Sequence, residues 1–342
     1  MSDLNALVRS FCGPFAFAGI GVSRGGAAQF HTATAQGIQA DADSFWRAAS
    51  ISKVVTGRTV WAALHGAGLD GTEPAQDLLG FSLRAPDGTA PTIAQIASHQ
   101  SGLTDAGGYA VPLGQPLQDW IAQRGAAIWS GASVGAQFEY CNLGFVIIAA
   151  CAEKVAGERF DTLAQRHVLG GIAAGFNWSG VPSNVETVPT YRATSGRFAP
   201  QIDAGGAVVN LPDPYVPGQH TAAFSPQGGL RISLRGALQL AQTLPLHPVD
   251  TGWQYDSART LGEMDLFQSY AWGMQILDEP AFYPRPLIGH FANAYGFCGG
   301  IWYDHHADIA FTYALNGLAM GDDDDALRTE ERAIFSSIAA LA

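Results

Sequence analysis

Ser50 and Lys53 are the two residues of this sequence best placed to do chemistry together. Both lie at the start of the stretch 50–65, whose apolar side chains are spread over nearly all sides of a helix, and this pattern predicts a buried helix. Residues three apart on a helix share a face, so the Lys53 amine can reach the Ser50 hydroxyl. The helix N-terminus favours negative charge on the serine oxygen, and a buried lysine can lose its proton near neutral pH and act as a base. The structural alternative is that Ser50 caps the helix while Lys53 extends its amine to solvent.

Tyr140 and Asn142 form a second candidate group, just before another predicted helix. Side chains two apart in an extended segment point the same way, so the phenol and the amide can face one site. A phenol beside an ammonium group has its pKa lowered and can serve as a general acid or base. An ordinary loop in which Asn142 caps the helix is the alternative.

A third group lies in residues 289–300, where His290, Phe291 and Asn293 stand among several glycines. Glycines let a strand edge approach a ligand closely, and they offer backbone N–H groups to a developing oxyanion. A single histidine before a strand also commonly serves as a structural hydrogen bonder.

These three groups, in this order, resemble the serine β-lactamase and penicillin-binding protein superfamily. The resemblance is to its class C β-lactamase-like branch, which includes family VIII esterases and D-alanyl-D-alanine carboxypeptidases. The likeness runs from about Phe15 to the last predicted helix. Three further segments share it: residues 96–103, 227–233 and 272–274.

The resemblance implies that Ser50 is the nucleophile of an acyl-enzyme and that Lys53 and Tyr140 share the proton it loses. Which of the two is the base stays open, because coupled groups titrate as a pair. Asn142 would hold the amide or carbonyl of the substrate's acyl side, and backbone N–H groups of Ser50 and Asn293 would form the oxyanion hole. Deacylation would reuse Lys53 and Tyr140, and no cofactor or metal is implied.

The third group departs from the family pattern of Lys or His, then Thr or Ser, then Gly. Here the residues are His290, Phe291 and Ala292. Imidazole is largely neutral near pH 7, and Phe291 lacks the hydroxyl that would help to hold a carboxylate. An apolar residue beside the acyl site suits a neutral ester. An alignment that shifts the motif toward Tyr295 and Gly296 is the alternative.

We therefore expect a serine hydrolase, and specifically an esterase on small to medium acyl esters. A β-lactamase, a D-alanyl carboxypeptidase or a D-aminopeptidase is the alternative activity. A catalytically weak scaffold of the same fold is the alternative class of protein.

Strands at both ends of the chain and helices between them must position these groups. The patterns predict strands at 15–22, 29–35, near 230 and across 299–314, and helices at 95–99, 144–156 and 325–341. The expected fold class is α/β (α+β), β-lactamase/transpeptidase-like: an antiparallel sheet flanked by terminal helices, with an inserted helical domain. We expect the sheet domain at 1–75 and 225–342 and the helical domain at 76–224, with the active site between them.

The charge balance excludes several partners. Lys and Arg number 18 against 30 Asp and Glu, a net charge of −12, whereas nucleic acids and anionic membranes require a positive surface. Only Lys53 and Lys154 are lysines, so a motif that requires lysine has two possible positions. The expected partner is a small-molecule ester or amide, with no nucleic acid, no membrane and the oligomeric state left open.

The compartment is inferred from what the sequence lacks. No stretch approaches the ~18–20 apolar residues of a membrane span, and the first residues do not form a signal sequence, so a cytoplasmic location is expected. A periplasmic or secreted protein whose leader was removed would look the same. The four scattered cysteines predict free thiols, with disulfides as the alternative.

Several other patterns resemble functional motifs. Residues 21–25 and 131–135 match the Gly-x-Ser-x-Gly nucleophile elbow, which requires a strand-to-helix turn, but we expect a hairpin turn and a loop. Residues 304–308, Asp-His-His-Ala-Asp, could ligate a metal, but a solvated hairpin tip is expected. The acidic run 322–325 is expected to complement the dipole of the last helix.

Overall fold

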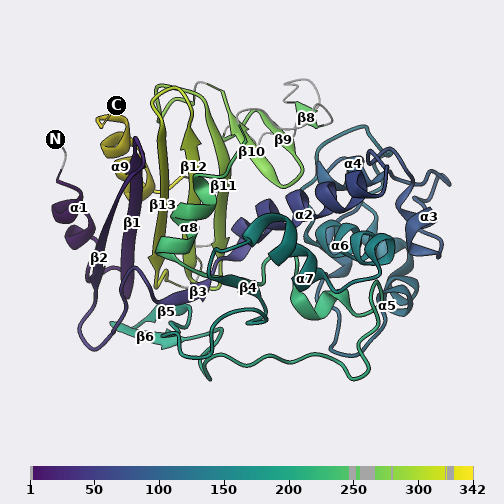
Figure 1. Ribbon diagram of the computed structural model, residues 1–342, viewed down its shortest axis with the longest axis horizontal. Coiled ribbons are helices and arrows are strands. Elements are labelled where there is room, and N and C mark those ends of the chain that lie inside the picture. Colours follow the sequence, from purple (N-terminus) through teal and green to yellow (C-terminus); the bar gives the residue numbers. More distant parts are fainter. Residues whose placement is uncertain are drawn as a thin grey trace.

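A large antiparallel sheet dominates the computed structural model, which describes residues 3–245, 252–254, 266–278, 280–319, 321 and 327–341. Its strands are β1 (Phe17–Arg24), β2 (Ala27–Thr34), β8 (Trp253–Gln254), β9 (Ser269–Ala271), β10 (Met274–Leu277), β11 (Leu287–Ala294), β12 (Phe297–Asp304) and β13 (Ile309–Asn316). Within the described ranges they lie in the order β2-β1-β13-β12-β11-β10-β9-β8, each antiparallel to its neighbour. The two ends of the chain therefore build one sheet, as Figure 1 shows.

Helices cover both faces of this sheet. On one face, Phe335 of α9 (Thr329–Ala339) packs against Phe311 and Tyr313 of β13. Side chains alternate along a strand, so Ala314, which follows Tyr313, and its partner Gly19 in β1 face the other side of the sheet. Leu234 of α8 (Leu234–Ala241) lies on that side, next to Gly19. Helix α1 (Leu4–Ser10) lies beside β1 and β2. The predicted terminal helix is present, although α9 begins at Thr329; residues 322–326, including the acidic run, lie outside the described residues.

A second group of helices lies beside the sheet (Figure 1). Its members are α2 (Ser52–Gly66), α3 (Ala75–Leu79), α4 (Ile93–Ala97), α5 (Leu117–Arg124), α6 (Asn142–Ala156) and α7 (Phe160–Ala164), with short turns η1 (Ala49–Ile51), η2 (Asp105–Gly107), η3 (Gly125–Ile128), η4 (Gln165–Leu169) and η5 (Thr221–Phe224). Helices α2 and α6 pack against each other and bury most of their side chains. None of the described helices has the length and hydrophobicity needed to cross a membrane.

The sheet approaches α2 at the β9–β10 turn. A Cβ atom on Gly57 would overlap the carbonyl oxygen of Trp272, and one on Gly273 would overlap that of Lys53. Gly273 also has a φ of 80°, a conformation that glycine adopts without cost. The two glycines therefore allow the backbone of the turn to lie directly on the first turns of α2.

Two smaller sheets join the parts of the chain. Strand β7 (Leu230–Ser233) lies between β3 (Phe45–Arg47) and β4 (Ala174–Phe176), and β5 (Tyr191–Thr194) pairs with β6 (Arg197–Pro200). The mixed α/β fold with its antiparallel sheet is as expected. The strands β4, β5 and β6 fall inside the segment expected to be helical, so the division at 75/76 and 224/225 stays a proposal.

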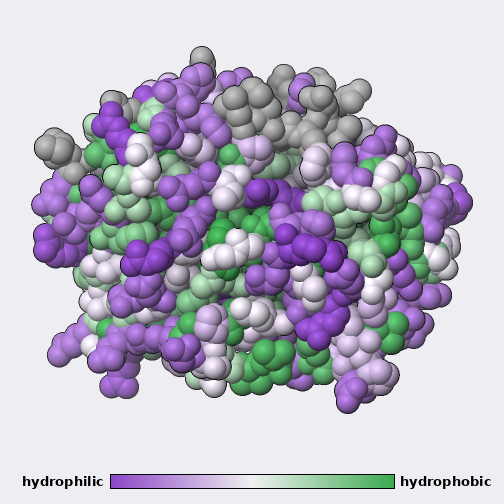
Figure 2. Space-filling model, in the orientation of Figure 1, coloured by the Kyte–Doolittle hydropathy of each residue, from purple (hydrophilic) through white to green (hydrophobic). Residues whose placement is uncertain are grey.

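The surface is polar over much of the visible face (Figure 2), and the other motif-like segments occupy turns and loops. Hydrophilic residues are spread over the face in Figure 2, across the sheet and the helices alike. Residues 21–25 end β1 and enter a hairpin turn, and 131–135 lie in a loop, so neither is a nucleophile elbow. The carboxylate of Asp304 is buried and accepts hydrogen bonds from Tyr283 and Arg285 and from the backbone N–H groups of the 304–308 turn. All four cysteines are free, as predicted.

Candidate active site

Ser50 and Lys53 meet at the start of α2. Ser50 lies in the turn η1, and Ala49 before it has a φ of 45°, which is sparsely populated for a residue with a side chain. The Lys53 Nζ atom lies 3.2 Å from Ser50 Oγ, 2.7 Å from Asn142 Oδ1 and 2.9 Å from the Gln227 carbonyl oxygen. Lys53 is 0% exposed. Its amine therefore does not extend to solvent, which removes the structural alternative for this residue.

Burial sets the ionisation of Lys53. Loss of solvent, with a smaller contribution from the nearby Arg47 charge, lowers the pKa of Lys53 from 10.5 to about 7, against the opposing effects of Asp105 and Cys141. A substantial fraction of the amine is therefore unprotonated near neutral pH. In that form it can accept a proton from Ser50.

Tyr140 approaches Ser50 from the other side. Its hydroxyl donates to Ser50 Oγ at 2.9 Å, and the Lys53 Nζ atom lies 4.7 Å from the centre of its ring. The serine hydroxyl thus lies between a phenol and an amine, the two groups that the sequence places on different segments. Either can exchange a proton with it directly.

His99 holds the segment that carries Tyr140. Its carbonyl oxygen accepts from the Glu139 N–H at 2.8 Å, and its Nδ1 atom accepts from the Cys141 N–H at 3.0 Å. Burial lowers the pKa of His99 well below its usual value, so the ring is neutral and can accept. The two bonds bracket Tyr140, which explains why residues 96–103 accompany the second group.

Asp105 is the site residue that the sequence analysis missed. Its carboxylate accepts from the backbone N–H of Asn142 at 2.9 Å, from Asn142 Nδ2 at 2.8 Å and from the backbone N–H of Leu143 at 3.1 Å. Asp105 therefore caps α6, and Asn142 does not. The available signal was its place two residues after the 96–103 segment, but nothing in the spacing indicated which helix it would cap.

His290 lies on β11 and faces Tyr140. Its ring centre lies 6.3 Å from that of Tyr140, its Nε2 atom lies 3.1 Å from the Tyr270 hydroxyl, and its Nδ1 atom contacts the Phe291 carbonyl oxygen. Burial, with the Lys53 charge adding to it, lowers the pKa of His290 to about 3. His290 is thus neutral at physiological pH and supplies no positive charge to this strand.

Phe291 points to the opposite face of the sheet. Its ring packs at 4.5 Å from Trp302 and 5.9 Å from Phe335 of α9. The expectation that its ring stands beside the acyl site is therefore wrong in orientation, because side chains alternate along a strand and His290 occupies the other face. Phe291 meets the site through its backbone, whose N–H donates to Gln275 Oε1 at 2.8 Å.

Asn293 follows Phe291 by two residues. Backbone N–H groups two apart on a strand point to the same side, so the Asn293 N–H is directed to the same edge of β11 as that of Phe291. This strand lies alongside η1, which carries Ser50. The role of the Ser50 and Asn293 N–H groups as an oxyanion hole stays a prediction.

A cavity of about 980 Å³ gives access to these residues, and Ser50, Tyr140, Asn142 and His290 are on its wall. The charged side chains that line it among the described residues are Arg47, Glu139, Arg328 and Glu331.

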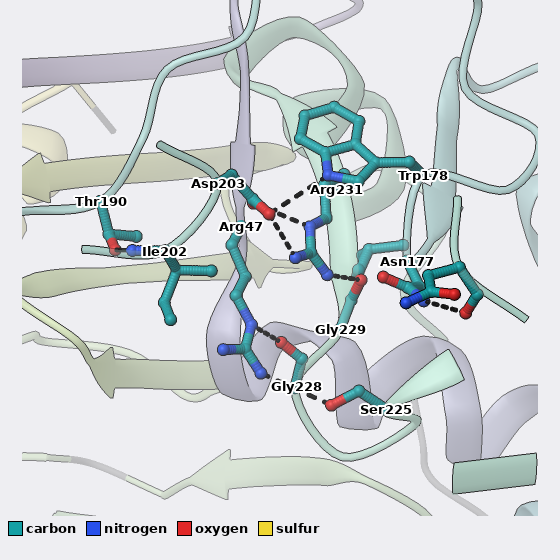
Figure 3. Close-up of polar contacts among 12 residues, drawn as sticks. Arg47, Asn177, Trp178, Thr190, Ile202, Asp203, Ser225, Gly228, Gly229 and Arg231 are labelled. Atoms are coloured by element: carbon teal, nitrogen blue, oxygen red, sulfur yellow. Dashed lines mark hydrogen bonds and ion pairs between the residues drawn. The ribbon is translucent and has the colours of Figure 1, made fainter. Parts of the chain in front are cut away.

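Arg47 has an unusual environment on this wall. Its Nε atom donates to the Gly228 carbonyl oxygen at 2.7 Å, and its guanidinium lies 4.6 Å from the centre of the Tyr295 ring. Figure 3 shows Arg47 beside the ion pair of Arg231 with Asp203. Arg47 itself pairs with no carboxylate in the described part of the chain.

Comparisons with known proteins identify the family and the fold. The Beta-lactamase family model matches residues 15–334. A D-stereospecific amidohydrolase from Streptomyces sp. has a similar fold, with a TM-score of 0.66, 16% identity, and 92% of this chain and 94% of that chain covered. A D-amino acid amidase from Ochrobactrum anthropi SV3, complexed with L-phenylalanine amide, has a TM-score of 0.69 and 13% identity, with 99% of this chain and 98% of that chain covered. A beta-lactamase/D-alanine carboxypeptidase from Yersinia pestis has a TM-score of 0.64 and 14% identity, with 100% of this chain and 99% of that chain covered. A search of curated proteins finds no match.

Proposed function

The chain belongs to the beta-lactamase family, and on that premise we propose that it is a serine hydrolase that works through an acyl-enzyme at Ser50. One observation carries the proposal. Ser50 Oγ lies within hydrogen-bond distance of both the Lys53 amine and the Tyr140 hydroxyl. A serine is a weak nucleophile unless an adjacent base takes its proton, and this site offers two such groups.

The proposed reaction has two halves. Ser50 Oγ bonds to the substrate carbonyl carbon while its proton passes to Lys53 Nζ or Tyr140 Oη, and the oxyanion turns toward the N–H groups of Ser50 and Asn293. The bond to the leaving group breaks as that group takes up the proton. Water then attacks the acyl carbon, gives its proton to the same pair, and releases the acid as the proton returns to Ser50.

We propose an ester of a small or medium acyl group as the substrate. A neutral His290 on β11 supports this, because a substrate carboxylate at that strand would find no cation in the first position of the motif. An uncharged acyl group needs no cation at this position, so its binding is not weakened by a neutral His290. The reaction would thus be ester hydrolysis rather than hydrolysis of an anionic β-lactam or peptide.

The test is a panel of nitrophenyl esters of increasing chain length, nitrocefin and D-amino acid amides, with Ser50→Ala as the control. We expect ester turnover that disappears in Ser50→Ala. Labelling with a fluorophosphonate, followed by mass mapping, should modify Ser50. A label on another residue, or ester hydrolysis that survives in Ser50→Ala, refutes the proposal. Labelling with measurable turnover excludes a scaffold without activity.

Glu139 supports a second candidate, the hydrolysis of D-amino acid amides or esters. Glu139 lines the cavity one residue before Tyr140, and its carboxylate pairs with no cation among the described residues. A carboxylate there can bind the ammonium group of an amino acid derivative. If so, Glu139→Gln should lower kcat/KM for a D-phenylalanine ester but not for its N-acetyl form. Equal losses on both forms would contradict this role.

A further inference from the structure

The Asp105 carboxylate holds the start of α6 together with the side chain of Asn142. It accepts hydrogen bonds from two backbone N–H groups of the helix and from Asn142 Nδ2, and the Cys141 thiol donates to it at 3.4 Å. The carboxylate is an acceptor only, so each of these contacts requires a donor on the other side. The contact with Asn142 thus determines which end of the amide faces Asp105.

The other end of the amide then faces Lys53. An amide has one donor end and one acceptor end, and with Nδ2 directed at Asp105 the Oδ1 atom lies 2.7 Å from Lys53 Nζ. The reversed amide would set its oxygen against the carboxylate and its NH₂ group against the amine. The contact of the oxygen with the carboxylate would be repulsive, and the NH₂ group would donate to the amine and occupy the lone pair that must accept the Ser50 proton. Asp105 therefore selects the orientation that leaves this lone pair free.

This orientation also decides where the unprotonated amine points. A neutral amine has two N–H groups and one lone pair. Two acceptors, Asn142 Oδ1 and the Gln227 carbonyl oxygen, lie within reach of Lys53 Nζ and take the two N–H groups. The third position around the nitrogen faces Ser50 Oγ, so the lone pair is directed at the proton that must be removed.

We propose that Asp105 is a positioning residue of this site: through the Asn142 amide it directs the lone pair of Lys53 at Ser50. The proposal rests on the proposed acyl-enzyme at Ser50. It adds a residue that does not touch the substrate and that acts only through Asn142 and Lys53.

Asp105 also influences Lys53 through its charge. The titratable and charged groups around Lys53 come from every element packed against it: Asp105, Arg47, His99, His290, Tyr140 and Cys141. Burial lowers the pKa of both histidines and raises that of the Cys141 thiol, so these three groups are neutral near pH 7. Tyr140 faces the amine with its ring, and the two charged groups, Arg47 and Asp105, act on the pKa of Lys53 in opposite directions.

The experiment measures the rate of Ser50 labelling by a fluorophosphonate from about pH 5 to about pH 10. In wild type the rate should rise with pH through the pKa of Lys53. For Asp105→Asn we expect a maximum rate about 10- to 100-fold lower, because the amine is misdirected. The rise should also move to lower pH, by about half a unit or more, because the negative charge that raises the Lys53 pKa is gone.

Two further variants separate position from charge and from folding. Asp105→Glu keeps the charge but displaces it, so its maximum should fall while the rise stays near the wild-type pH. Thr92→Ala removes the capping box of the neighbouring helix α4, a similar loss at a helix start that does not touch Lys53. Its rate and pH profile should match wild type, and thermal unfolding confirms that each variant is folded.

The outcomes are distinct. If wild-type Ser50 does not react, the proposed function fails and this proposal fails with it. If wild type reacts and both Asp105 variants keep its maximum rate, only the positioning role is overturned, whether or not the pH profile moves. A loss in Thr92→Ala as large as that in Asp105→Asn would assign the effect to stability and also overturn it.

Discussion

Lys53 should make the stability of this protein depend on pH in a way that its replacement abolishes. The folded state lowers the pKa of Lys53 to about 7, whereas the unfolded chain returns it to the ordinary value of 10.5. Between these values the unfolded state binds one more proton than the folded state. The free energy of unfolding therefore rises with pH in this window, by about 1.4 kcal/mol per pH unit.

Lys53→Met removes this contribution and leaves the other titrating groups in place. From about pH 7.5 to about pH 9.5 the stability of wild type should increase relative to Lys53→Met by about 2.7 kcal/mol. Below the folded pKa both states hold the proton, and the difference should become constant. The assay is urea unfolding followed by tryptophan fluorescence at a series of pH values, with linear extrapolation.

The decisive quantity is the difference in unfolding free energy between wild type and Lys53→Met at each pH. Tyrosine and cysteine residues also titrate in alkaline solution, and their contributions cancel in the difference. A difference that stays within about 0.5 kcal/mol over the window would refute the reasoning. It would mean that Lys53 keeps its proton in the folded protein and is not available as a base.

Three further predictions concern the other residues of the site. Tyr140→Phe should lower ester turnover by about 100-fold or more while changing the unfolding free energy by about 1 kcal/mol or less, as steady-state kinetics and urea unfolding can measure. His290→Gln should leave the shape of the kcat/KM profile unchanged from about pH 5 to about pH 6.5, because His290 is already neutral there; a limb lost in the variant would contradict this. Phe291→Ser should cost about 2–4 kcal/mol in urea unfolding, since the ring packs against Trp302 and Phe335, and should not create nitrocefin turnover; a gain of that activity would place the side chain at the site after all.

The residues at the starts of helices could be predicted because local spacing determines their direction. Ser50, in the turn η1, lies within hydrogen-bond distance of Lys53 in the first turn of α2, and Tyr140 and Asn142, on either side of the extended Cys141, both reach this pair. The hairpin of β1 and β2 was predicted for the same reason, from apolar runs around a Gly-rich turn. In each case the prediction concerned one continuous segment, whereas the contacts between segments, from Tyr140 to Ser50 and from Asn142 to Lys53, were not given by local spacing.

Phe291 and Asp105 could not be placed in this way. The direction of Phe291 depends on which face of β11 the helix α9 covers, and that helix comes some forty residues later in the sequence. Asp105 acts on a helix that begins 37 residues further along. The hairpin of β5 and β6 had a usable sequence signal that was missed, the dipeptide Ser195-Gly196. In the structure both residues have positive φ, as a two-residue hairpin turn requires.

Two of the segments that accompany the candidate catalytic residues, 227–233 and 272–274, keep Lys53 dry and hydrogen bonded. The Gln227 carbonyl oxygen takes one of its hydrogen bonds. The turn at Trp272 and Gly273 lies on the backbone of α2 between Lys53 and Gly57, where any side chain on either glycine would force the two apart. Water that entered such a gap would solvate the amine and return its pKa toward 10.5, leaving it protonated at neutral pH. The closeness of sheet and helix, set by Gly57 and Gly273, therefore helps to keep Lys53 buried and its pKa low, as the proposed role of a base requires.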